Sequence, residues 1–145
     1  MKIFIDTDTL VGLTLSVDNL HQQACKISKN LSRVKHELFT SSDVLKEALT
    51  VISQRGGKKV ALDFLKTMES KKSGIDIIFV NEELHHEGIK MFTRIKQKDI
   101  SVVDCVSYII MKQYSIEYIF SFDKHFSYLG CKLLNMIKEL RSSSN

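Results

Sequence analysis

The sequence has no proline, no tryptophan and only three cysteines among its 145 residues. Cys25, Cys105 and Cys131 form no short pairing pattern, and none lies at metal-ligand spacing from a histidine, so nothing indicates a disulfide framework or a zinc site. Free thiols are typical of a reducing cytosol, which predicts a cytoplasmic protein. The absence of proline indicates no particular function.

Long apolar runs are also missing. No stretch approaches the roughly 20 apolar residues that a membrane-spanning helix needs. Asp6 and Asp8 interrupt the only candidate for a signal peptide. We therefore expect no membrane partner. The net charge of +4 is mild, so it permits an anionic partner such as RNA but does not require one.

The composition is that of one ordinary globular domain. Hydrophobic residues make up 43% of the chain and charged residues 26%. A chain of this length buries a sizeable core without disulfides or metals. Repeats, linkers and low-complexity segments are absent from the sequence. We expect a single domain over residues 1–140 and a frayed C-terminal tail at residues 141–145.

Short apolar runs alternate with segments of helical periodicity. Residues 3–5 are continuously apolar, which is typical of a strand covered on both faces. The alternation predicts an α/β fold with three α/β/α layers and a mainly parallel sheet of four or five strands. Strands are expected at residues 3–5, 38–40, 75–80, 118–120 and 132–134, and helices at residues 9–16, 18–34, 44–55, 58–70 and 82–96 and from residue 101 onward.

Acidic residues follow two of the expected strands. Asp6 comes directly after residues 3–5, and Asp123 follows residues 118–120. Because the carboxyl ends of parallel strands meet at one edge of a sheet, where α/β proteins bind their ligands, we expect Asp6 and Asp123 to end neighbouring strands. Taken alone, Asp6 or Asp8 also fits an N-cap of the next helix.

Two further acids have ordinary structural explanations. Asp104 lies at the third position of a helix after Ser101, which is the spacing of a capping box. Glu47 lies off the apolar stripe of its helix, where a solvated glutamate is the common case. The four acids are therefore informative as a set rather than singly.

In order and context this set resembles the PIN-domain ribonucleases, above all the VapC-type toxins of bacterial and archaeal toxin–antitoxin pairs. The family's opening strand and Asp-Thr/Ser-x-x-Leu motif is matched by IDTDTL at residues 5–10. Its helical glutamate is matched by VLKEALT at residues 44–50. Its Ser-x-x-Asp and Thr/Ser-x-Asp-x-x-Phe motifs are matched at residues 101–104 and 121–126. The similarity spans residues 2–134, with Asp8 as a departure from the family pattern.

The resemblance implies a metal-dependent ribonuclease. Carboxylates about 4 Å apart repel by roughly 4 kcal/mol at an effective dielectric of about 20, which favours a cation among them. Hard oxygen ligands suit Mg²⁺ or Mn²⁺. By resemblance, the catalytic and metal-binding residues are Asp6, Glu47, Asp104 and Asp123, with Ser121 and Thr7 supporting them. From their places in the sequence, we expect Asp8 and Asp99 to extend the acidic pocket, and Arg55 and Lys58, near the helix of Glu47, to contact RNA phosphates. The implied partners are RNA, a second copy in a homodimer, and a small antitoxin whose basic or aromatic segment enters the acidic cleft.

Three other hypotheses fit parts of the sequence. Residues 4–10 also match the Asp-x-Asp-x-Thr opening of haloacid-dehalogenase-type phosphatases, with Asp6 as nucleophile and Asp8 as general acid/base. That family needs a later Gly-Asp-x-x-x-Asp-like motif, which residues 121–126 lack. A housekeeping PIN nuclease and a non-catalytic module that binds RNA or protein remain open. The four acids argue against the non-catalytic module, because a pure scaffold has no need for their mutual repulsion.

Overall fold

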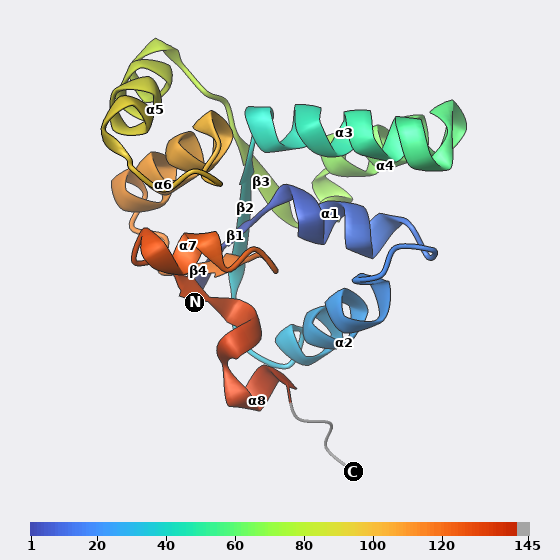
Figure 1. Ribbon diagram of the computed structural model, residues 1–145. Helices are drawn as coiled ribbons and strands as arrows, with labels where there is room; N and C mark the ends of the chain where they lie inside the picture. The colour runs from blue at the N-terminus through green and yellow to red at the C-terminus, as the bar shows by residue number, and fades with distance from the viewer. Residues whose placement is uncertain (142–145) are drawn as a thin grey trace.

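The computed structural model describes residues 1–141, apart from the side chains of Lys71, Glu139 and Arg141. Its centre is one five-stranded sheet in the order β3-β2-β1-β4-β5, with every neighbouring pair parallel. The predicted three-layer α/β/α fold is confirmed, with five strands (Figure 1). The strands are β1 (Lys2–Ile5), β2 (Glu37–Ser41), β3 (Ile75–Ile78), β4 (Tyr118–Phe120) and β5 (Lys132–Leu133).

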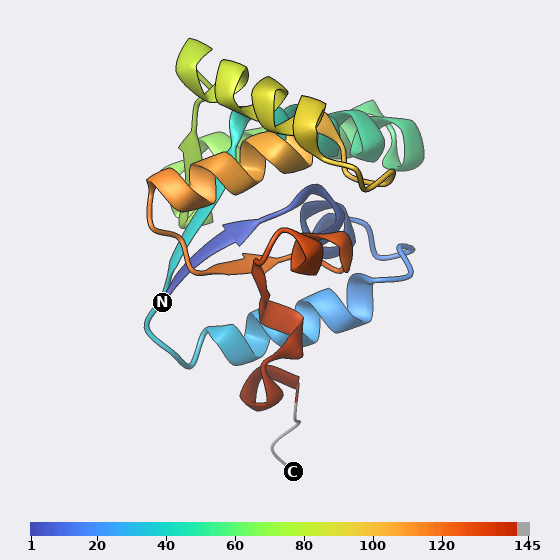
Figure 2. The same ribbon diagram turned by 60° about the vertical axis from the view of Figure 1, so that its left-hand side comes forward.

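Helices cover both faces of the sheet. Figure 2 shows α3 to α6 on one side of the strands and α2 and α8 on the other. Helix α8 ends at Arg141, and the rest of the expected tail lies outside the described residues. The helices are α1 (Thr7–Thr14), α2 (His21–Leu31), α3 (Ser42–Gly56), α4 (Lys58–Glu69), α5 (Glu82–Arg94), α6 (Val102–Gln113), α7 (His125–Tyr128) and α8 (Lys138–Arg141), with short 3-10 turns at Lys71–Ser73 and Leu134–Met136.

The continuous apolar character of β1 follows from this layering. Phe4 belongs to the larger apolar cluster, with side chains of α3, α4, α5 and α6. Ile3 points into a smaller cluster with Ile27 of α2 and Leu140 of α8. Both β1 side chains are fully buried, because successive residues of a strand face opposite sides of a sheet that is covered on both.

The strand order places the candidate site. From β1 the chain moves outward to β2 and β3, and it then returns to the other side of β1 for β4 and β5. The sheet therefore has its topological switch point between β1 and β4, the position at which α/β sheets open a ligand crevice. Ile5 pairs with Phe120, so the residues after both strands lie side by side at the carboxyl edge.

Several elements differ from their expected bounds by two or three residues; helix α1, for example, spans Thr7–Thr14 rather than residues 9–16. In two of them a local contact gives the reason. Helix α2 was expected from residue 18 but begins at His21. The Asp18 side chain instead accepts a hydrogen bond from the Leu20 N–H at 2.8 Å and forms a turn ahead of the helix. Strand β3 ends at Ile78, and the Val80 N–H donates to Ser42 Oγ (3.0 Å) at the start of α3 rather than to a strand.

Helices α5 and α6 approach each other at a glycine. A Cβ placed on Gly88 would lie 2.3 Å from Val106 Cγ2 and 3.2 Å from the Val106 Cα. Since real Cβ atoms do not come that close, any side chain at position 88 would force the two helices apart. The close packing fixes the position of α6, whose first turn contains Asp104.

Among the described residues, no helix combines the length and the apolar character that crossing a bilayer would demand.

Candidate active site

The four predicted acids lie together at the carboxyl edge of the sheet. They line one cleft of about 340 Å³, although they come from four different parts of the chain. Asp6 follows β1, Glu47 lies on α3, Asp104 on α6, and Asp123 follows β4. The residues lining the cleft are Asp6, Thr7, Asp8, Val11, Asp18, Leu20, Glu47, Val51, Arg55, Asp104 and Asp123.

Asp6 lies at the bottom of the cleft. Its backbone N–H donates to the Phe120 carbonyl at 3.1 Å, which continues the β1–β4 pairing by one residue. Ser121 Oγ donates to Asp6 Oδ2 at 2.9 Å. The residue is only 7% exposed. Burial raises the pKa of Asp6 to about 8, with a further contribution from the neighbouring Asp8 charge.

Asp8 joins α1 to the end of β4. The Phe122 N–H donates to Asp8 Oδ2 at 2.8 Å, and Ser121 Oγ lies 3.3 Å from the same oxygen. Burial raises the pKa of the Asp8 carboxyl group. The side chain that departs from the family pattern is therefore part of the cleft wall and a close neighbour of Asp6.

Glu47 points toward the start of α1. The side chain lies off the apolar stripe of α3, as its spacing predicts, but Thr7 Oγ1 donates to Glu47 Oε2 at 2.9 Å. Partial burial against the cleft wall raises the pKa of Glu47, and the charge of Asp104 adds to that shift. The local helix pattern predicts a solvated glutamate, whereas the structure holds Glu47 within an acidic cluster.

Asp104 forms the capping box that its spacing predicts and also lines the cleft. The Ser101 N–H donates to Asp104 Oδ2 at 2.8 Å, and the Asp104 N–H donates to Ser101 Oγ at 3.1 Å. Burial raises the pKa of Asp104, and the charge of Asp123 contributes as well. The capping geometry and the cleft position therefore coexist in one residue.

Asp123 is fixed by a short network after β4. Its backbone N–H donates to Ser121 Oγ at 3.1 Å. Its Oδ1 accepts from the His125 backbone N–H at 2.8 Å and lies 2.6 Å from His125 Nδ1. The other ring nitrogen of His125 lies 3.6 Å from Asp99 Oδ2. Asp99 is largely exposed and does not line the cleft, so it reaches the acidic set only through His125.

The two predicted phosphate-binding residues differ in position. Arg55 lines the cleft, and its Nη1 donates to Asp18 Oδ2 at 2.6 Å. Lys58 is exposed at the start of α4 and does not line the cleft. Asp18 was not among the predicted site residues. Its pairing with a residue 37 positions away leaves no local sequence pattern.

The donor set suits a hard divalent cation that keeps part of its water shell. Each predicted ligand has one carboxyl oxygen held by a hydrogen bond within the protein. Within the described part of the chain, no three Asp, Glu, His or Cys side chains are gathered tightly enough to hold an ion unaided. Mg²⁺ typically binds through a few carboxylates and retained waters. A cation would also favour the charged forms of carboxyl groups whose pKa values are raised.

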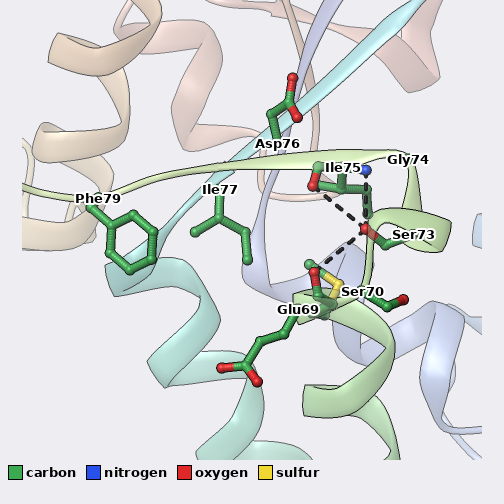
Figure 3. Close-up of a pocket in the computed structure, with 9 residues that line it drawn as sticks. Glu69, Ser70, Ser73, Gly74, Ile75, Asp76, Ile77 and Phe79 are labelled. Atoms are coloured by element: carbon green, nitrogen blue, oxygen red, sulfur yellow. Dashed lines mark hydrogen bonds between the residues drawn. The ribbon is translucent and has the colours of Figure 1, made fainter.

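A second hollow, of about 570 Å³, lies beside the edge strand β3 (Figure 3). Its two carboxylates, Glu69 and Asp76, come from α4 and β3, and the two side chains point in different directions in the close-up. Neither shows a contact with another acid there. The larger hollow therefore lacks the converging charge of the cleft at the β1–β4 switch point, which we take as the candidate active site. The hollow beside β3 is lined by Met68, Glu69, Ser70, Ser73, Gly74, Ile75, Asp76, Ile77 and Phe79.

Known proteins share the sequence pattern and the fold of this chain. The model of the PIN domain family matches residues 3–130. The 23S rRNA-specific endonuclease VapC20 of Mycobacterium tuberculosis, in strains CDC 1551 / Oshkosh and H37Rv, is 26% identical over 128 residues, which cover 88% of this chain and 94% of the relative. The crystal structure of M. tuberculosis VapC20, described as a sarcin-ricin loop cleaving toxin, matches with a TM-score of 0.77 at 26% identity and covers 89% of this chain and 95% of that one.

Proposed function

The chain belongs to the PIN-domain family, and on that premise we propose that it is a divalent-metal-dependent endoribonuclease and the toxin of a toxin–antitoxin pair. The observation that carries this proposal is the convergence of Asp6, Glu47, Asp104 and Asp123 in one cleft. Residues that only stabilised the fold would gain nothing from being gathered where their charges repel.

The four carboxylates have distinct places in the proposed reaction. Asp6 and Asp123, at the ends of β1 and β4, face the cleft from the sheet, and Glu47 and Asp104 face it from the helices. Together they would hold Mg²⁺ or Mn²⁺, directly or through water. A bound divalent ion would stabilise negative charge on the phosphodiester oxygens. It would also lower the pKa of a water molecule bound to it, so that this water can react at neutral pH. The protein's own contribution is to position the carboxylates and the RNA strand around that charge.

The supporting residues keep those carboxylates in place. Thr7 orients Glu47, and Ser121 orients Asp6 while accepting the Asp123 N–H. Such contacts behind a ligand fix its direction and its basicity. Asp8 adds a further carboxylate to the cleft wall, and Asp99 acts through His125. Arg55 in the cleft and the exposed Lys58 at the start of α4 are the proposed contacts to RNA phosphates.

The geometry does not favour a phosphatase of the haloacid-dehalogenase type. In that mechanism Asp8 would donate and accept protons at the substrate, yet its Oδ2 is engaged by the Phe122 N–H. The family match over residues 3–130 also supports the PIN nuclease instead. A housekeeping PIN nuclease would share this cleft and would differ only in the biological role of the cleavage.

For the substrate and partners we start from the relatives. VapC20 is named as a 23S rRNA-specific endonuclease, and its crystal structure is described as that of a sarcin-ricin loop cleaving toxin. An exposed loop of ribosomal RNA is therefore the first substrate that we propose for this chain. We also propose a homodimer, a small antitoxin that places a basic or aromatic segment in the acidic cleft, and a cytoplasmic location, for which the three free cysteines offer support.

Cleavage of a labelled ribosomal stem-loop tests the activity. The wild-type protein, stripped with EDTA and then loaded with Mg²⁺ or Mn²⁺, should cut the loop, and Asp6→Asn should not cut it while remaining folded. Asp63→Asn, an exposed acid on α4, is the matched control and should cut at the wild-type rate. Equal cleavage by the EDTA-treated and metal-loaded proteins would contradict the proposed mechanism.

The toxin role needs a separate measurement. Expression of the wild-type chain alone should arrest growth, and Asp6→Asn should be harmless at the same protein level. A neighbouring gene for a small DNA-binding protein should relieve the arrest. Growth unaffected by an active nuclease would favour the housekeeping role.

A further inference from the structure

The cleft contains one cation among the residues that line it in the described part of the chain. Arg55 shares the cleft with Asp6, Asp8, Glu47, Asp104 and Asp123, yet its ion pair is with Asp18, a further residue of the same lining. The guanidinium carries five donors, and Asp18 Oδ2 engages Nη1. The Arg55 side chain is 44% exposed, so donors remain open to a ligand, whereas the Asp18 side chain is 11% exposed.

Asp18 is itself held firmly. Its Oδ1 accepts the Leu20 N–H at 2.8 Å, and its Oδ2 accepts Arg55. The carboxylate therefore has one oxygen fixed by the backbone and the other directed at the guanidinium. Figures 1 and 2 both show the α1–α2 loop and the C-terminal end of α3 on the same side of the molecule, which is where this pair forms.

The position of Arg55 along α3 suits a phosphate other than the reacting one. Glu47, Val51 and Arg55 follow each other at intervals of four residues and all line the cleft. At about 1.5 Å per residue, Arg55 lies roughly 12 Å along the helix axis from Glu47. Because the ion pair with Asp18 holds the guanidinium at that end of the cleft, Arg55 suits another phosphate of the same strand better than the one cleaved beside Glu47.

We propose that Arg55 binds a phosphate neighbouring the cleaved one in the RNA strand and that Asp18 is the positioning residue that keeps the guanidinium at this distance. Without Asp18, the Arg55 guanidinium would be drawn toward the carboxylates that hold the metal. The Asp18–Arg55 pair thus keeps the guanidinium that binds the RNA strand apart from the carboxylates that hold the metal. This inference rests on the proposed ribonuclease activity.

A purely structural role is the competing explanation. The pair joins the α1–α2 loop to the last turn of α3, where a positive charge also suits the helix dipole. Other contacts already anchor that loop, however. Leu15 is buried, and a Cβ on Gly56 would lie 2.7 Å from Leu15 Cδ2, so the loop and α3 are in close contact without the ion pair.

The test measures RNA binding and cleavage separately. Binding of a labelled single-stranded RNA is measured at several salt concentrations with Mg²⁺, in an Asp6→Asn background that prevents cleavage. Arg55→Gln should weaken binding about 10- to 100-fold, as expected for a charge-assisted hydrogen bond. It should also reduce the slope of log affinity against log salt by about 0.7, the value for one contact to a single strand. In the active protein it should raise KM more than it lowers kcat.

Arg94→Gln is the matched control. Arg94 is an exposed arginine in the last turn of α5, so its removal changes the net charge and a helix end in the same way without touching the cleft. Its salt slope and KM should equal those of the wild type. An unchanged slope for Arg55→Gln, in a protein that binds and cleaves RNA, would overturn this inference and leave the proposed function intact. A wild type that neither binds nor cleaves RNA would overturn both.

Asp18→Asn isolates the positioning role. Asparagine can still accept the Leu20 N–H through its Oδ1, so the turn before α2 is kept and the charge is lost. Asp18→Asn should raise KM several-fold in the wild-type background and change nothing further in the Arg55→Gln background, because both act through one guanidinium. Asp18→Glu should restore part of the wild-type KM. If Asp18→Asn changes KM equally in both backgrounds, or lowers the melting temperature and leaves KM unchanged, the Asp18–Arg55 pair has only a structural role.

Discussion

Ser121 Oγ donates a 2.9 Å hydrogen bond to Asp6 Oδ2 and thereby links the ends of the two strands at the switch point of the sheet. The two residues are 115 positions apart in the chain. The same hydroxyl oxygen accepts the Asp123 N–H. A single buried serine therefore sets the relative positions of two of the four carboxylates.

Replacing this serine should damage both stability and activity. Ser121→Ala leaves the buried Asp6 carboxyl without its donor, which costs about 1–3 kcal/mol, and removes a contact that lowers the pKa of Asp6. We expect cleavage to fall about 10- to 100-fold, as for other residues that orient ligands. Chemical denaturation and single-turnover cleavage measure the two effects.

Ser107 offers the matched control. It is also a fully buried serine, and no hydrogen-bond partner is recorded for its Oγ within the described residues. Ser107→Ala should be nearly neutral in stability and in cleavage. Equal losses for the two alanine variants would show that any buried serine matters, and the specific role of Ser121 would be wrong.

The metal-free protein should lose stability as the pH rises. The pKa of Asp6 is about 8 in the folded protein against an ordinary value of 3.8. Between about pH 4 and pH 8, therefore, the folded state holds a proton that the unfolded chain has already released. The free energy of unfolding therefore falls across that window, by up to about 1.4 kcal/mol per pH unit for one group. Asp6→Asn should make the profile measured in EDTA less steep, and the raised pKa values of Asp8, Glu47 and Asp104 account for the slope that is left. Asp63→Asn should retain the wild-type slope.

Asp104 should lose its metal contribution without losing much stability. Asp104→Ala removes the reciprocal contact of the capping box but relieves repulsion in the metal-free cleft, so the two effects oppose each other. The stabilisation by metal, about 2.7 kcal/mol for the wild type at 100 times the dissociation constant, should disappear. Ser101→Ala should cost about 1 kcal/mol with or without metal and keep that stabilisation. If metal stabilises Asp104→Ala as much as it stabilises the wild type, Asp104 is a helix-capping residue and not a metal ligand.

Thr7 should matter through its hydroxyl group. Thr7→Val keeps the shape of the side chain but removes the donor to Glu47 Oε2, so the glutamate loses its orientation. We expect cleavage to fall about 10-fold or more, with little change in melting temperature at this exposed contact. Thr7→Ser retains the donor and should recover most of the activity. Similar rates for the valine and serine variants would contradict the orienting role.

The sequence predicted the fold because its strands are local apolar runs. Residues 3–5 and 119–120 are buried, so each strand is visible without knowledge of its partners. The parallel arrangement then placed Asp6 and Asp123 at one edge, and the structure puts both in the same cleft. Glu47 needed the family resemblance, because its local pattern indicates a solvated face.

The remaining features depend on contacts between distant segments. Asp18 has the sequence signature of a helix start, and its pairing with Arg55 arises only after the α1–α2 loop meets α3. The four-residue helices α7 and α8 are too short to show periodicity. The contact of His125 with Asp99 likewise joins the first residue of α7 to the loop before α6, and no spacing within either segment indicates it.

Gly88, at the crossing of α5 and α6, is a position where substitutions should impair the protein although the residue has no reactive group. A methyl group at Gly88 would meet the Val106 backbone, and the displaced α6 would carry Asp104 with it. In a genetic selection for variants that no longer harm their host, substitutions at position 88 should therefore be recovered alongside those of the carboxylates. A mutational map of the protein would then mark as functional a residue that has no side chain and lies outside the cleft lining.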